Sequence, residues 1–214
     1  LLEGPCLVAQ EANKHYLLEL EPDRLLYAYR QSAGLPTPGE PSGGWEAPDH
    51  PLRGHFLGHY LSACAQMYAS TGDEAVKAKA ALVVQELASC QQAFGGDGYL
   101  CAHPRAEFDC FLSERLKGNY GTWGGWHCPL YMFHKMLAGL LEQYQLCGNQ
   151  QALDVVEQLA GFFMKFNMDD YKAMFGQEHG GFVEFWHNLY AATGNAQYLE
   201  LGERLLTIES FLTP

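Results

Sequence analysis

The stretch Tyr68-Ala69-Ser70-Thr71-Gly72-Asp73 has two counterparts further along the chain, Tyr144-Gln145-Leu146-Cys147-Gly148-Asn149 and Tyr190-Ala191-Ala192-Thr193-Gly194-Asn195. In each copy the glycine suits the left-handed conformation that ends a helix, and the following Asp or Asn suits the cap of the next helix. Gly-Asp and Gly-Asn also occur at unrelated helix ends, but the tyrosine at the same position in all three copies favours a true repeat. The pattern predicts recurring helical hairpins, which indicate an array or a toroid.

The composition is that of a globular protein, because 48% of the 214 residues are hydrophobic and 18% are charged. This length suits one domain with a sizeable core, or part of a larger domain. No apolar run is long enough to span a bilayer. The formal net charge of -12 would repel a phosphate backbone, so nucleic acid is not an expected partner.

The seven cysteines are odd in number and form no Cys-x-x-Cys pair. They therefore indicate neither a disulfide framework nor a zinc ribbon, and we interpret them as free thiols. A nucleophilic cysteine needs a cation or a metal that lowers its pKa. No cysteine has such a neighbourhood in the sequence, although Cys128 directly follows His127.

Apolar residues at helical spacing predict helices at 7–19, from Pro22 onward, and at 55–72, 73–92, 129–147, 149–166, 182–193 and 195–211. Glycine-rich segments interrupt them at 34–51, 93–126 and 175–181. A loop as long as 93–126 is usually functional or disordered, and its aromatic residues argue against disorder. No alternating strand of convincing length is found, so the fold class is predicted as all-α, with about eight helices.

Polar and aromatic residues that suit a ligand gather at the loop junctions rather than along the helices. They are Trp45, Glu46, His55, His59, Asp97, Tyr99, Trp126, His127, His134, Glu178, His179 and Glu184. In a helical toroid the loops at one end surround the axis and form a concave pocket. An aromatic ring covers the apolar C–H face of a sugar while polar side chains bond its hydroxyls, so this mixture predicts a polyhydroxylated ligand.

Two pairs of histidines share helix faces. His55 and His59 are four residues apart, but the Glu of a His-Glu-x-x-His metal motif is missing and no third ligand is obvious. We interpret both as hydrogen-bonded pocket or core histidines. His127 and His134 are two helical turns apart, and we favour a ligand-facing role for His127 and a core role for His134.

The segment Glu178-His179-Gly180-Gly181 precedes a helix whose first turn carries Glu184. Acids at a helix start often serve capping alone, so structural and functional roles remain equally open for Glu178 and Glu184, while function is favoured for His179. Hydrolysis of a glycoside normally takes two carboxyl groups. Glu46, Asp97, Glu178 and Glu184 are the candidates, and the sequence does not show which two converge.

Eight short segments carry a family resemblance over nearly all of the chain: Gly4-Pro5, Asp23-Arg24-Leu25-Leu26, Gly34-Leu35-Pro36, Gly43-Gly44-Trp45-Glu46, Gly58-His59-Tyr60-Leu61-Ser62-Ala63, Asp97-Gly98-Tyr99-Leu100, His134-Lys135-Met136-Leu137-Ala138-Gly139-Leu140 and Glu178-His179-Gly180-Gly181. In this order they resemble the β-L-arabinofuranosidase family of glycoside hydrolases, family 127 and its relative 146.

The resemblance implies an (α/α)6 toroid with a sugar pocket at one end. It also implies that histidines at the positions of His127 and His179 bind arabinofuranose. Trp45, Glu46 and His59 would lie close to that pocket. With the loop-junction residues, the expected substrate-binding set is Trp45, Glu46, His59, Asp97, Tyr99, Trp126, His127, Glu178 and His179.

One departure from the family pattern concerns catalysis. The resemblance implies an acid/base Glu and a nucleophilic Cys bound to zinc, which a Glu-x-Cys motif and a Cys-Cys pair hold. Neither motif occurs in this sequence, and Val183 stands where the family often has Asn. We therefore expect residues 1–214 to be the N-terminal portion of the catalytic domain, without a metal site of its own. The catalytic residues, and the zinc implied for the full-length enzyme, are expected beyond Pro214.

Two accounts of function follow from the resemblance. In the first, the chain is a segment of an enzyme that releases arabinofuranose from plant-type glycans or glycoproteins by a retaining mechanism, and it is inactive alone. In the second, it is a non-catalytic carbohydrate-binding or structural subunit derived from that fold. In both, an incomplete toroid leaves an apolar inner face exposed unless the missing C-terminal part of the barrel or another chain covers it.

Overall fold

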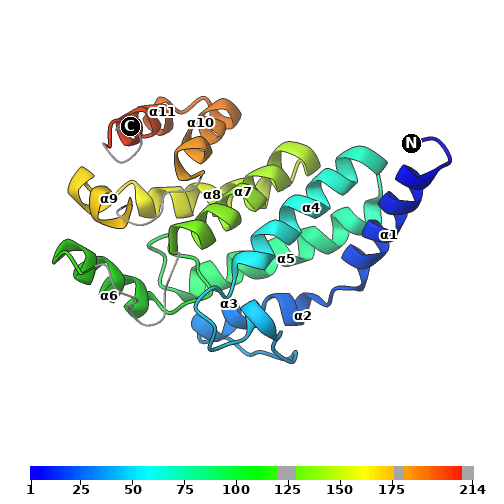
Figure 1. Ribbon diagram of the computed structural model, residues 1–214, viewed down its shortest axis with the longest axis horizontal. Helices are drawn as coiled ribbons and strands as arrows, with labels where there is room; N and C mark the ends of the chain where they lie inside the picture. The colour runs from blue at the N-terminus through cyan, green and yellow to red at the C-terminus, as the bar shows by residue number, and fades with distance from the viewer. Residues whose placement is uncertain (120–128, 176–180, 209–214) are drawn as a thin grey trace.

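Figure 1 shows the computed structural model of the chain, which describes residues 1–119, 129–175 and 181–208. Within these residues no strand is present, which confirms the predicted all-α class. Nor does any helix in this part of the chain have the length and apolar character needed to cross a membrane. The elements are α1 (Pro5–Glu19), α2 (Pro22–Leu25), α3 (Tyr27–Ser32), a 3-10 helix (Gly44–Glu46), α4 (His55–Thr71), α5 (Glu74–Ala93), α6 (Arg105–Leu116), α7 (Pro129–Cys147), α8 (Gln150–Phe163), α9 (Met168–Phe175), α10 (Phe182–Thr193) and α11 (Ala196–Leu206).

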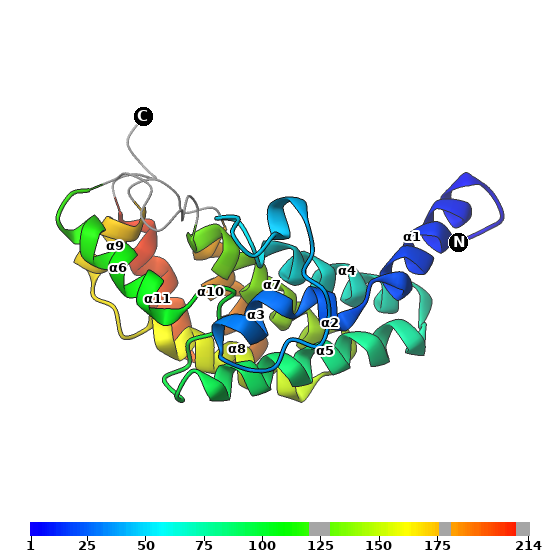
Figure 2. The same cartoon turned by 90° about the horizontal axis from the view of Figure 1, so that it is seen from below.

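The long helices form two layers, which Figures 1 and 2 show from perpendicular directions. We call α4, α7 and α10 the inner helices, because α4 packs closely against α7 and α7 also contacts α10. Each inner helix is joined by a tight turn to an outer helix: α4 to α5, α7 to α8 and α10 to α11. Successive hairpins stacked side by side form an arc of an α/α toroid, as the repeated turns predict.

The three repeated turns have the geometry that the sequence predicts. Gly72, Gly148 and Gly194 take left-handed φ values of 68°, 68° and 74°. Each donates its N–H to the carbonyl of the tyrosine four residues earlier, at 2.7, 2.9 and 2.7 Å. The Asp or Asn that follows accepts a backbone N–H from the first turn of the next helix. One local signal therefore ends an inner helix and starts its outer partner three times.

Glycines bring α4 and α7 into backbone contact. A Cβ atom added to Gly58 would lie 2.3 Å from the carbonyl oxygen of Lys135, and one added to Gly139 would lie 2.4 Å from the carbonyl oxygen of Gly58. The buried Gln143 of α7 also donates to the carbonyl of Leu61 on α4, at 2.7 Å. Because the two helices touch through their backbones, the side chains along their shared face are held in a fixed register.

The sequence predicts a long loop at 93–126, and that prediction is wrong for α6. This helix buries only Phe108, Phe111 and Arg115, so its apolar period is too weak to indicate a helix from the sequence. Phe108 lies with its ring centroid 5.4 Å from that of Phe162 and 6.0 Å from that of Tyr99. Packing against this aromatic core stabilises a helix that has little amphipathic pattern of its own. The short α9 likewise lies in a segment where the sequence predicts no helix.

Candidate functional site

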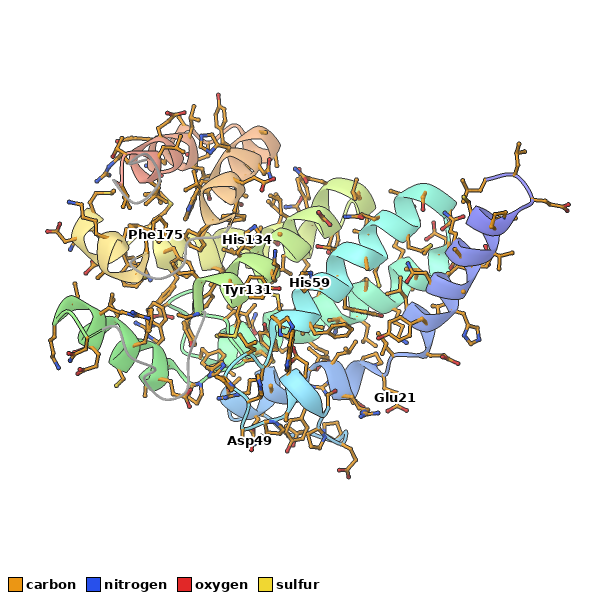
Figure 3. The ribbon with its side chains drawn as sticks, viewed as in Figure 1. Glu21, Asp49, His59, Tyr131, His134 and Phe175 are labelled. Atoms are coloured by element: carbon orange, nitrogen blue, oxygen red, sulfur yellow. The ribbon has the colours of Figure 1, made fainter. Side chains whose placement is uncertain are left out.

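The first turns of α4 and α7 meet the start of α10 at one place, and most of the described candidate residues lie there. Figure 3 shows His59, Tyr131 and His134 close to one another where α4 and α7 begin. His59 Nε2 lies 3.0 Å from the Tyr131 hydroxyl oxygen, which joins α4 to α7. Gly181, directly before α10, contacts the His134 ring so closely that an added Cβ would lie 2.4 Å from His134 Cε1. The glycine therefore leaves the room that this histidine occupies.

Glu46 holds the start of α4. Its carboxylate accepts the N–H of Gly54 at 2.6 Å and the N–H of Phe56 at 2.9 Å. Because Gly54 has no side chain to cap the helix, a carboxylate from the preceding 3-10 helix serves the orphan N–H groups and complements the helix dipole. The same carboxylate lies 2.8 Å from Nδ1 of His55. Glu46 thus caps the helix and pairs with a neighbouring histidine, and its assignment to substrate binding stays a prediction.

Four aromatic rings surround this end of α4. The ring of His55 lies 6.1 Å from Trp45, 6.0 Å from His59 and 6.0 Å from Tyr131, measured between centroids. Trp45 is 66% exposed, so most of its surface faces solvent. An exposed indole beside three polar rings offers an apolar surface and several hydrogen-bonding atoms within one small region.

A cavity of about 330 Å³ has His59 of this cluster in its lining and follows the inner helices. Its polar lining residues are His59, Ser62 and Gln66 from α4, His134, Lys135, Glu142 and Gln145 from α7, and Glu184 and Asn188 from α10. The lining is mainly polar, with Ala138, Leu141 and Phe185 as its apolar members. The apolar residues of the inner helices are mostly buried within the core, which leaves polar side chains along the cavity.

A larger cavity of about 410 Å³ lies where α1, α2 and α3 approach the 3-10 helix. It is bordered by Glu46 and by the side chains of Tyr16, Arg24 and Tyr27. None of its lining residues is a histidine, whereas the smaller cavity is lined by His59 and His134 and by three inner helices. We therefore place the candidate site at the smaller cavity.

The histidines of the site have different pKa values, because their surroundings differ. Burial, with a further contribution from Lys135, lowers the pKa of His134 to about 4. Burial and the same lysine also lower the pKa of His59. The hydrogen bond to Glu46 instead raises the pKa of His55. Near neutral pH, His59 and His134 are therefore uncharged and each can both donate and accept a hydrogen bond.

Two predicted site residues lie elsewhere. Tyr99 has 0% exposure and donates its hydroxyl to the carbonyl of His103 at 2.9 Å, so it is a core residue and does not line the cavity. Asp97 accepts the Tyr99 N–H at 3.0 Å and pairs with Arg105, while its carbonyl accepts from Lys165 at 2.6 Å. These contacts fix the loop before α6. Sequence reasoning selected both residues because they lie in a glycine-rich loop, which proves to be a structural junction.

Four predicted site residues lie outside the described part of the chain: Trp126, His127, Glu178 and His179. Their assignment to the substrate site remains a prediction. Described residues that follow the two gaps, such as Tyr131 and Gly181, contact the histidines of the site.

The family resemblance implies a zinc centre, which needs several His, Cys, Asp or Glu side chains close together. Among residues 1–119, 129–175 and 181–208, no three His, Cys, Asp or Glu side chains converge as metal ligands. Burial raises the pKa of the Cys64 thiol to about 11, and those of Cys90 and Cys101 to about 12. The donor set in this part of the chain does not fit a zinc–thiolate centre.

Sequence reasoning missed several residues of the cavity. Ser62 and Gln66 lie seven and eleven residues after His55, so they share one face of α4 with His55 and His59. On α7, Tyr131 lies about one turn before His134 and contacts His59. The recurrence of polar residues along one helix face is the sequence signal that indicates these residues, and it lies outside the loop junctions.

These features define an all-α domain of stacked hairpins with a polar cleft where its inner helices begin. The chain belongs to the family described as the β-L-arabinofuranosidase, glycoside hydrolase family 127 catalytic domain, whose model matches residues 1–213. The resemblance noted from the sequence segments is thereby confirmed.

A solved structure supports the same fold. The crystal structure of a family 127 β-L-arabinofuranosidase from Geobacillus stearothermophilus T6 is similar over 92% of this chain, with a TM-score of 0.65 and 19% sequence identity. The chain spans 30% of the length of that protein. No curated protein matches the chain.

Proposed function

We propose that this chain is the N-terminal portion of an (α/α)6 β-L-arabinofuranosidase catalytic domain and forms part of its sugar-binding wall. The observation that carries the proposal is a polar cavity lined by His59 and His134, together with the rings of His55, Tyr131 and Trp45 that lie near His59. Family membership supplies the class of ligand, a glycan that contains arabinofuranose. The cavity volume of about 330 Å³ suits a small ligand, since small-molecule pockets begin at about 300 Å³.

The chemistry of the cleft matches a neutral sugar. The exposed ring of Trp45 provides a surface for the C–H face of a furanose. His59 and His134 are uncharged near neutral pH and can exchange hydrogen bonds with hydroxyl groups. On the opposite side of the cavity, the exposed Glu184 and Asn188 of α10 provide acceptors and an amide donor.

We assign binding, and not bond cleavage, to the described residues. Glycoside hydrolysis normally takes a pair of carboxyl groups that flank the scissile bond, whereas the family resemblance implies an acid/base Glu and a zinc-bound Cys. The carboxylate of Glu46 already accepts two backbone N–H groups and faces His55. The sequence also lacks the Glu-x-Cys and Cys-Cys motifs that the family resemblance implies for catalysis. In this proposal the acid/base and the nucleophile are supplied by groups other than these.

Isothermal titration with methyl β-L-arabinofuranoside tests the binding proposal. We expect saturable binding by the chain and a loss of about tenfold in affinity for His59→Ala, because one or two hydrogen bonds to the sugar are removed. His15→Ala is the matched control, since His15 is an exposed histidine on α1 that pairs with Glu19. Absence of binding, or equal losses in both variants, would refute the proposal.

Turnover of an aryl β-L-arabinofuranoside separates binding from cleavage. We expect binding without hydrolysis by the chain. Hydrolysis that survives extensive purification would overturn the assignment of cleavage to other groups. Binding without hydrolysis even by the longest natural form of the protein would favour the non-catalytic carbohydrate-binding account.

A further inference from the structure

The surroundings of His55 determine which of its ring nitrogens carries a proton. Nδ1 lies 2.8 Å from the carbonyl oxygen of Leu52 and 2.8 Å from a carboxylate oxygen of Glu46. A carbonyl and an ionised carboxylate only accept hydrogen bonds, so Nδ1 must donate. In the neutral imidazole the other nitrogen, Nε2, then carries a lone pair and acts as an acceptor.

Nε2 of His55 has no hydrogen-bond partner among the residues that the structure describes. In the part of the chain that the structure describes, His55 makes its hydrogen bonds through Nδ1 and its backbone. The ring is nearly buried, with 9% exposure, and its neighbours are the rings of Trp45, His59 and Tyr131. By contrast, Nε2 of His59 is already 3.0 Å from the Tyr131 hydroxyl.

We propose that His55, whose ring neighbours His59 of this cleft, accepts a sugar hydroxyl through Nε2, and that Glu46 is a positioning residue that, with the Leu52 carbonyl, favours the tautomer protonated at Nδ1. This inference rests on the proposed function, because it names the kind of group that the same site recognises. Because Nε2 of neutral His55 is a nearly buried acceptor, it favours a ligand that places an O–H donor next to it. A sugar without that hydroxyl leaves Nε2 unpaired and binds more weakly.

The backbone contacts of Glu46 hold its carboxylate beside Nδ1 of His55. Its carboxylate is anchored by the N–H groups of Gly54 and Phe56, so it has little freedom to turn away from His55. The titratable groups that face the His55 ring are Glu46 from the 3-10 helix, His59 from α4 itself and Tyr131 from α7. Of these, Glu46 is the acidic residue, and its hydrogen bond raises the pKa of His55. Nε2 is therefore an acceptor above that elevated pKa.

Side-chain nitrogen NMR of the wild-type chain tests the tautomer without any ligand. We expect neutral His55 to show a protonated Nδ1 and an unprotonated Nε2. In Glu46→Gln the carboxylate at Nδ1 is lost while the Leu52 carbonyl remains, so we expect a lower pKa and a weaker preference for the tautomer protonated at Nδ1, and Glu46→Asp should restore part of the wild-type signal. Glu19→Gln, which removes the partner of the exposed His15, is the matched control and should leave His55 unchanged. A wild-type His55 protonated at Nε2 would overturn the inference.

The same NMR signals, followed during titration with methyl β-L-arabinofuranoside, test the contact with sugar. We expect the Nε2 resonance of His55 to shift on binding and Glu46→Gln to weaken binding about tenfold with its helical circular dichroism intact. Binding of sugar with no change at Nε2 would refute this inference and leave the proposed function standing. Absence of binding by the wild-type chain would refute both.

Discussion

Replacement of Gly58 by alanine should separate α4 from α7 and thereby damage both the fold and the candidate site. The added Cβ would lie 2.3 Å from the carbonyl oxygen of Lys135 and 2.6 Å from the nitrogen of Met136, whereas ordinary contact begins at 3.4 Å. Both atoms belong to the backbone of a helix and cannot rotate away. We therefore expect the helices to move apart by about 1 Å.

The magnitude follows from two opposing effects. Alanine in a helix interior is more favourable than glycine by about 1 kcal/mol. Overpacking costs about 1–3 kcal/mol where side chains can adjust, and more where backbone must move. We expect a net loss of roughly 2 kcal/mol in the free energy of unfolding. A separation of this size would also stretch the 3.0 Å contact between His59 and Tyr131 beyond hydrogen-bonding distance, so sugar affinity should fall as well.

Urea denaturation followed by circular dichroism measures the effect. Gly161→Ala in α8 is the matched control, because an added Cβ meets no atom within 4 Å there. That variant should be stabilised by about 0.5–1 kcal/mol through the same gain in helix propensity. If Gly58→Ala proved as stable as Gly161→Ala, the close approach of α4 and α7 would be refuted.

Other substitutions test separate parts of the structure. The folded-state pKa of His55 is raised above its ordinary value of 6.5, so its pair with Glu46 stabilises the fold fully below that value and less as pH rises through the elevated pKa. The loss in free energy of unfolding caused by Glu46→Gln, measured by urea denaturation, should accordingly be larger at about pH 6 than at about pH 9. The opposite trend would refute a stabilising interaction between His55 and Glu46. Asp73→Ala should lower the free energy of unfolding by about 1 kcal/mol, because the cap of α5 is lost, and no loss would refute the capping role. Tyr99→Phe should cost about 1 kcal/mol through its bond to His103 yet leave sugar affinity unchanged, and a changed affinity would return Tyr99 to the site.

The local signals of the sequence predicted most of the fold. The turns at Gly72, Gly148 and Gly194 are encoded within six residues each, so they can be recognised without tertiary information. The helix α6 was not recognised, because packing of Phe108 against rings from distant segments stabilises it rather than its own periodicity. The close approach of α4 and α7 at Gly58 could not be predicted either, because a glycine inside a helix does not by itself indicate a contact with another helix.

The candidate site was predicted in part. His59 lines the cavity, and the Trp45 ring lies 6.1 Å from that of the neighbouring His55, while the assignment of both Trp45 and His59 to substrate binding stays a prediction. Glu46 has a task that was not expected, because the sequence does not show that Gly54 leaves α4 in need of a distant cap. The role of Tyr131 depends on the register of α7 against α4, which only the packed structure determines.

Backbone amide NMR of the chain during titration with methyl β-L-arabinofuranoside tests the central claim most directly. The claim is that sugar binds where the inner helices begin. It predicts that shift changes concentrate at residues 55–62, 131–138 and 181–188, which form the first turns of α4, α7 and α10. Shift changes centred instead on the cavity between α1, α2 and α3, or no changes at saturating sugar, would contradict it.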